Sequence, residues 1–177
     1  MKTFLCSMLL GVAMTSGVLA KSKVSVNEVI ESSFSSVTKV EPKALILTQA
    51  QFKKVRSSAK TAMDTKVYRY YNILSKAKKL GTAVLITRKV RSKKATVLYA
   101  FDNKGTLRFS EIMAFGEPPE FIPSKIWMSQ LQNQKPTAKL TIGKDIPTIS
   151  GATLSARTIS EGARVARALY EIVLKNK

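Results

Sequence analysis

The feature that most constrains the fold is a series of strand-like runs separated by short turns. Four runs rich in β-branched and aromatic residues follow one another: 67–74, 82–90, 95–101 and 107–115. A basic turn over 91–94 and a tight turn over 102–105 connect the last three runs, and Gly81 is expected to break the chain before them. These connections predict an antiparallel meander of four strands, with one face on the core and the other toward water or a ligand.

Helical patterns precede these strands. Apolar residues at near-helical spacing within 21–40 predict a short amphipathic helix, which Pro42 is expected to end. Thr48 is a suitable N-cap for a second helix over 49–62.

Further helices follow the strands, after a stiff loop that contains Pro118 and Pro119. Ser124 is a suitable cap for a short helix that ends near residue 132. Thr158 and Glu161 match the capping-box pattern, which predicts the start of the last helix. The sequence therefore predicts an α+β fold, in which an antiparallel β-sheet meander packs against α-helices.

The first twenty residues have the pattern of a secretory signal peptide. Lys2 precedes a mostly apolar run, and residues 18 and 20 are small. We expect residues 1–20 to be removed, with a retained membrane anchor as the alternative, although the run is short for a spanning helix. The mature chain would then begin at Lys21, with an N-terminal helical region over 21–66 and one domain over 67–177. It would be periplasmic or lie on the outer face of the cytoplasmic membrane.

Two residue types that carry much protein chemistry are missing from the expected mature chain. The sequence has no histidine, and its one cysteine, Cys6, lies within the signal peptide. Iron–sulfur clusters, attached c-type haem, zinc sites built on Cys or His, and histidine-dependent triads are therefore excluded. The remaining chemistry must use hydroxyls, carboxylates, amines or a bound organic cofactor.

The chain is strongly cationic. Of 30 basic residues only Lys2 falls in the signal peptide, and none of the 11 acidic residues does, so the mature net charge is 29 minus 11, or +18. Such a charge favours anionic partners, either an anionic membrane surface or an acidic redox protein, and nucleic acid is not expected outside the cytoplasm. Plain solubility is the alternative explanation.

The segment that points most directly to chemistry is 150–155, rich in hydroxyls and placed before the last helix. Gly151 and Ala152 leave little side-chain bulk beside Thr153, so that a large ligand can approach its hydroxyl. The helix N-terminus behind it offers free N–H groups and a positive dipole end, which suit a phosphate. From the residues alone, a loop and a helix cap remain the alternative.

Ser150, Gly151, Ala152 and Thr153, followed by Leu154, Ser155 and a helix, resemble the flavinylation motif of the FMN-binding domain family. That family includes the covalent-flavin subunits of the sodium-pumping NADH:quinone reductase and of Rnf complexes. The resemblance implies that a flavin transferase takes FMN from FAD and joins its phosphate to Thr153 as a phosphoester. It also implies that residues 67–177 are a single FMN-binding domain.

The resemblance covers roughly residues 67–175 and extends to other parts of the site. A turn with Asp102 and Gly105 precedes a loop with Glu117, then a helix that bears Trp127. Glu117 is a candidate to shape the flavin pocket or only its own turn, and Trp127 to contact the flavin or only the core. The family's usual Asp three positions before the motif is Pro147 here, with Asp145 as the nearest replacement.

The function implied by the resemblance is electron transfer. An exported flavoprotein would accept electrons from a membrane-bound donor and pass them to an extracytoplasmic acceptor, without being a stand-alone enzyme. Two alternatives remain from the sequence: a flavin-free basic module that binds an anionic envelope surface, and a flavin reductase with its own small substrate.

Overall fold

The sheet of this protein has five antiparallel strands. The computed structural model describes residues 24–76 and 78–177, so that the expected signal peptide lies outside the described residues. The strands run in the order β1-β2-β3-β4-β5, each paired with its neighbour in the chain. Their bounds are β1 Lys39–Ile46, β2 Val67–Ser75, β3 Lys78–Lys89, β4 Lys94–Asp102 and β5 Leu107–Phe115. The expected four-stranded meander is present as β2 to β5.

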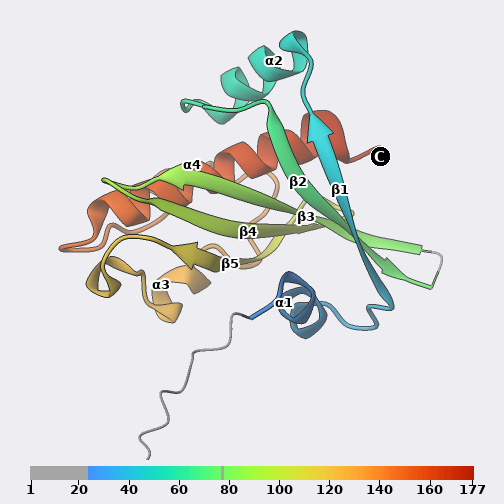
Figure 1. Cartoon of the computed structure of the whole chain (residues 1–177), viewed down its shortest axis with the longest axis horizontal. Helices are drawn as coiled ribbons and strands as arrows, with labels where there is room; N and C mark the ends of the chain where they lie inside the picture. The colour runs from blue at the N-terminus through green and yellow to red at the C-terminus, as the bar shows by residue number, and fades with distance from the viewer. Residues whose placement is uncertain (1–23, 77) are drawn as a thin grey trace, which may run out of the picture.

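Helices cover both faces of this sheet. Their bounds are α1 Val26–Ser33, α2 Gln49–Ala59, α3 Lys125–Ser129 and α4 Thr153–Leu169, with a 3₁₀ turn Pro119–Phe121 and a π-helical turn Tyr170–Leu174. The side chains of α2 and α4 share the larger core with one face of the sheet, whereas α1 packs on the opposite face (Figure 1). The α+β fold predicted from the sequence is confirmed. None of the helices in the described part of the chain is long and apolar enough to cross a membrane.

The first strand was not expected from the sequence. The sequence predicts the end of a helix and a connection at Pro42 for residues 39–46, but they form β1 at the edge of the sheet, with Pro42 opposite Tyr71. An edge strand tolerates proline because it has one side without a partner strand. The helix expected within 21–40 ends earlier, at Ser33, with Phe34 extended as its C-cap.

Gly81 lies inside β3 rather than breaking the chain. A β-carbon at this position would lie 2.2 Å from the carbonyl oxygen of Phe101 on the neighbouring strand, so that only glycine allows this approach. The pairing register between β2 and β3 also shifts beside it, between Ile73 and Leu74. The glycine therefore serves a close backbone contact at a β-bulge.

The start of the last helix was also predicted wrongly. The helix begins at Thr153, five residues before the expected capping box at Thr158. Two other predicted starts are confirmed: the Thr48 hydroxyl accepts from the N–H of Gln51, and the Ser124 hydroxyl accepts from the N–H of Trp127. The flavinylation-like segment thus includes the first turn of a helix, and its threonine is the first helical residue.

We predict that Gly81→Ala destabilises the fold by about 1–3 kcal/mol, as overpacking usually does, because the backbone of Phe101 must move away from the new methyl group. Urea unfolding followed by circular dichroism measures the change. Lys89→Ala, at an exposed position of the same strand, is the control and should change stability by no more than about 0.5 kcal/mol. Equal stability of wild type and Gly81→Ala would contradict the close approach.

Candidate functional site

The hydroxyl of Thr153 lies at the N-terminus of α4, with the side chain exposed to solvent. Gly151 turns the chain with a φ of 77°, a conformation that favours glycine, and a β-carbon there would meet nothing within 4 Å. The Thr153 hydroxyl donates a 3.0 Å hydrogen bond to the carbonyl of Ile149. No side chain of the described residues caps α4 at Ala152, so that the first N–H groups of the helix have no side-chain partner there.

A cavity of about 210 Å³ opens beside this helix start. Three segments supply its walls: the β3–β4 turn, the loop after β5, and the motif. The lining residues are Val90, Arg91, Glu117, Phe121, Gly151, Ala152, Thr153, Leu154 and Ser155. Five of the site residues predicted from the sequence motif therefore share one cavity, together with Glu117.

The chemistry of this cavity suits a phosphate ester of an aromatic ring system. Arg91 and the open helix N-terminus supply positive charge and N–H donors, which stabilise a phosphate, whereas the ionised Glu117 in the same lining contributes one negative charge. Val90, Phe121 and Leu154 supply apolar walls. The volume is below the ~300–1,000 Å³ of cavities that enclose a drug-sized ligand, so that the site would enclose only part of an FMN molecule. The residues of the cavity therefore fit FMN as a ligand that is only partly enclosed.

Glu117 organises the turn that carries Arg91. Its carboxylate accepts hydrogen bonds from the backbone N–H groups of Arg91, Ser92 and Lys93, at 3.0, 2.6 and 2.6 Å, and from the Ser92 hydroxyl at 3.2 Å. The N–H of Lys93, then those of Ser92 and Arg91, stabilise the ionised form and lower the pKa of Glu117 to about 2. Glu117 thus shapes both its turn and the cavity, as its side chain also lines the latter.

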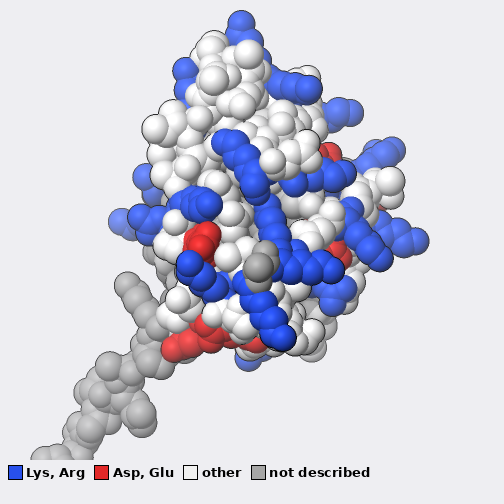
Figure 2. All heavy atoms as spheres, turned by 90° about the vertical axis from the view of Figure 1, so that its right-hand side faces the viewer, with Lys and Arg blue, Asp and Glu red and all other residues white. Residues whose placement is uncertain are grey.

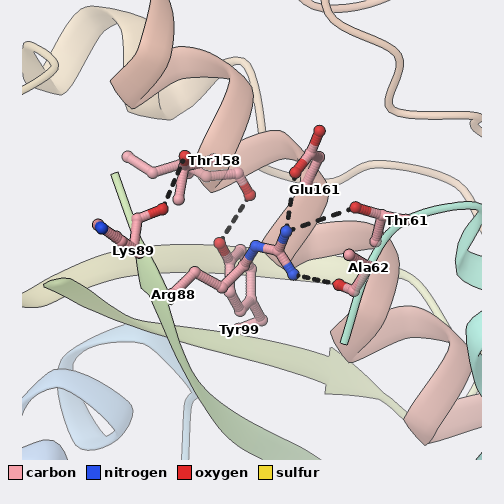
Figure 3. A network of polar contacts seen from close by, with 8 residues as sticks. Thr61, Ala62, Arg88, Lys89, Tyr99, Thr158 and Glu161 are labelled. Carbon is pink, nitrogen blue, oxygen red and sulfur yellow. Dashed lines mark hydrogen bonds and ion pairs between the residues drawn. The ribbon is translucent and has the colours of Figure 1, made fainter. Parts of the chain in front are cut away.

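A polar network fixes the end of β3 against α4 (Figure 3). Arg88 forms a 2.8 Å ion pair with Glu161 and donates to the carbonyl of Ala62. Thr158 donates to the carbonyl of Lys89 at 3.4 Å. The two residues expected to cap the last helix therefore bind β3 from within α4. This network joins the strand that leads into the Arg91 turn to the helix that begins at the motif.

Three other residues singled out from the sequence do not line the cavity. Trp127 is 7% exposed, belongs to the core, and donates its indole N–H to the carbonyl of Pro147 at 2.8 Å. Ser150 is exposed in the turn before α4. The Asp145 carboxylate accepts from the N–H of Thr141 within a local turn.

Sequence reasoning did not single out three of the lining residues: Val90, Arg91 and Phe121. Arg91 belongs to the basic turn that was recognised only as a connection between strands. One feature of the sequence could have indicated that Arg91 lies at the site: the basic turn and the Glu-Pro loop both follow strands of the same meander. Only the folded chain shows that the carboxylate of Glu117 binds this turn.

One comparison with known proteins assigns this part of the chain. Residues 91–168 match the family model described as the FMN-binding domain. This segment belongs to the FMN-binding domain family. No curated protein matches the chain. The FMN-binding domain match contains every residue that lines the cavity except Val90, and it runs from Arg91 almost to the end of α4. The family supports FMN as the cofactor, as the sequence predicted.

We predict that Glu117→Gln removes part of the acid sensitivity of the fold. The folded carboxylate has a pKa of about 2, below the ordinary value of 4.5, so that its stabilisation is complete above pH 4.5 and is lost as the pH falls through 2. The variant should be less stable than wild type at neutral pH, and this difference should shrink toward pH 2. Urea unfolding across this range measures it.

Glu120→Gln, at an exposed position of the following 3₁₀ turn, is the matched control for the loss of one negative charge. A stability difference between wild type and Glu117→Gln that stays constant from pH 7 to pH 2 would contradict the role of the carboxylate in holding the turn.

Proposed function

We propose that this FMN-binding protein holds its flavin covalently on Thr153 and transfers electrons outside the cytoplasm. The observation that carries the proposal is the position of Thr153, exposed as the first residue of α4 and on the wall of the cavity. Gly151 and Ala152, which have little side-chain bulk, precede Thr153, and an open helix N-terminus follows it. The exposed Thr153 is therefore accessible to a modifying enzyme.

The proposed attachment is a transfer from FAD by a flavin transferase. The Oγ of Thr153 forms a bond to the phosphorus of the FMN half, the P–O bond of the pyrophosphate breaks, and AMP leaves. The hydroxyl proton passes to a base of the transferase or to water. No oxidant or reductant is needed, because only a phosphoryl bond is exchanged.

In the loaded protein, the residues of the chain would bind, orient and shield. Arg91 and the first N–H groups of α4 would stabilise the remaining phosphate charge. Phe121 and Leu154 would exclude water from one side of the cavity. FMN supplies the redox chemistry when it is bound, and the protein supplies its position and electrostatic environment.

The proposed partners follow from location and charge. We propose an exported chain that begins at Lys21, is loaded by the transferase, receives electrons from a membrane-bound donor and passes them to an acidic redox protein. The expected mature charge of +18 supports docking of an acidic protein or an anionic membrane surface. Lys and Arg side chains form a nearly continuous band across the face in Figure 2, with acidic side chains at several places beside it.

The decisive test is the mass of the protein expressed with a flavin transferase and an intact N-terminal segment. Wild type should gain ~438 mass units, the FMN residue of a phosphoester, and keep a fluorescent band under denaturing electrophoresis. Thr153→Ala should lack both, with stability within about 1 kcal/mol of wild type because the side chain is exposed. Thr153→Ser keeps a hydroxyl and should retain partial labelling.

Docking and electron transfer separate the proposal from its alternatives. Thr153→Ala should still bind an acidic partner, with affinity that falls as salt shortens the screening length to ~10 Å near 0.1 M, but should not transfer electrons. An unmodified mass for wild type would favour a flavin-free basic module. Turnover of a small substrate without a protein partner would favour a flavin reductase.

A separate prediction concerns export. The mature N-terminus should be Lys21, because residues 18–20 provide a small-residue cleavage site after a short apolar run. N-terminal sequencing of protein isolated from the envelope fraction measures it. Recovery of membrane-bound chains that begin at Met1 would show a retained anchor instead.

A further inference from the structure

A second cavity lies between α2, α4 and the loop before the motif. It measures about 260 Å³. It is lined by Ser58, Ala59, Lys60, Ala138, Lys139, Thr141, Arg164, Arg167, Ala168 and Glu171. Four of these residues are cations and one is an anion, so that the lining of this half-open cavity carries an excess of positive charge.

Arg167 is the most informative residue of this cavity. Its side chain is 7% exposed, and one guanidinium nitrogen donates to the carbonyl of Ala138. Its Nε and Nη2 atoms are buried without a hydrogen-bond partner among the described residues. Buried polar groups are nearly always hydrogen-bonded, and an unpaired buried charge is strongly destabilising. Desolvation lowers the pKa of Arg167, but arginine remains charged near neutral pH.

A second guanidinium shares this property. The Nε of Arg164, one helical turn before Arg167, is also buried without a partner in the part of the chain that the structure describes. Two side chains three residues apart on a helix lie on the same face, and here both line the cavity. Together they offer N–H donors in the planar geometry that matches phosphate oxygens.

The charges around the cavity favour an anion. Lys60, Lys139 and the two arginines contribute four positive charges, whereas Glu171 contributes one negative charge. The C-terminal end of α2, next to Lys60, contributes roughly −0.5. The sum is about +2.5, so that a dianion is attracted even after both opposing charges are counted.

This cavity is separate from the FMN site. Thr153 and Arg164 are eleven residues apart on α4, which corresponds to ~16 Å along the helix at 1.5 Å per residue. The two cavities have no lining residue in common. A phosphate esterified to Thr153 therefore does not reach the guanidinium of Arg167.

We propose that this cavity is a binding site for a phosphoryl dianion, either inorganic phosphate or the phosphate end of a small phosphomonoester. The guanidinium groups of Arg164 and Arg167 donate to its oxygens, and the exposed Lys60 and Lys139 neutralise its charge. The volume of about 260 Å³ is below the ~300–1,000 Å³ range of pockets that enclose larger ligands, so that the cavity can enclose a phosphoryl group but not the whole of a larger ligand.

Thermal unfolding and titration calorimetry of the mature chain test this proposal, with sodium phosphate and glycerol 3-phosphate as probes against sodium chloride at equal ionic strength. Both phosphates should bind saturably and raise the unfolding temperature above that in chloride, because a ligand of the native state stabilises it. Similar affinities would identify free phosphate as sufficient, whereas much tighter binding of glycerol 3-phosphate would identify an organic phosphomonoester as the source.

Three variants and two controls locate the binding. Arg167→Gln should abolish phosphate binding. Arg164→Gln and Lys139→Gln change less buried residues and should weaken binding about tenfold or more. These two variants keep the proposal testable if Arg167→Gln does not fold. Lys135→Gln, an exposed cation of the same loop outside the cavity, should bind like wild type. Thr153→Ala should also bind like wild type, which separates this proposal from flavin attachment.

Two outcomes would overturn the proposal. One is the absence of saturable binding of either phosphate beyond the effect of chloride. The other is equal weakening by Lys135→Gln and Lys139→Gln, which would assign binding to the overall positive charge. Loss of flavin in Thr153→Ala with unchanged phosphate binding would leave both proposals supported.

Discussion

Tyr99 donates a 2.7 Å hydrogen bond from its phenol to the backbone carbonyl of Ile159, in the middle of α4. Burial raises the pKa of Tyr99, which keeps the phenol protonated as a donor. The approach is possible because Gly162 has no side chain, and a β-carbon there would lie 2.5 Å from the phenol oxygen. This contact seats α4 on the sheet, and the positions of both cavities follow from it.

Most of the acidic side chains that form bonds in the described part of this cationic chain bind backbone groups and do not pair with lysine or arginine. Of 11 acidic residues, six are used in hydrogen bonds or ion pairs within the described structure: Glu28, Glu41, Asp102, Glu117, Asp145 and Glu161. Most of these bonds hold caps and turns rather than neutralise lysine or arginine. The positive charge therefore stays on the surface and around the second cavity, where it favours anionic ligands.

The sequence predicts the meander well because the signals for β2 to β5 are local. Strand-forming residues and the Asp102 turn need no distant partner to be recognised. The first strand was missed because Pro42 usually ends regular structure, and only its place at a sheet edge makes it acceptable. The start of α4 was missed because Thr158 and Glu161 match a capping pattern. In the structure both lie inside the helix, where Thr158 binds the Lys89 carbonyl and Glu161 binds Arg88.

The candidate site shows the same division between local and distant signals. The motif residues 151–155 are adjacent in sequence, so that their common location was predictable, and they share the cavity. Arg91 and Phe121 were not predicted, because their approach to Thr153 depends on the bonds between Glu117 and the β3–β4 turn. The guanidinium of Arg167 carried no sequence signal, since a basic residue on an amphipathic helix usually faces water.

The size of the cavity beside Thr153 bears on why attachment would be covalent. A space of about 210 Å³ encloses only part of FMN, and a ligand left partly in water gains little binding free energy from burial. A deeper pocket would bind the free cofactor more tightly but would also bury the ring away from a partner protein. Under the proposed mechanism, the phosphoester at Thr153 removes the dissociation equilibrium, so that retention no longer depends on burial. The shallow cavity then leaves the flavin accessible to both donor and acceptor, which electron transfer between proteins requires.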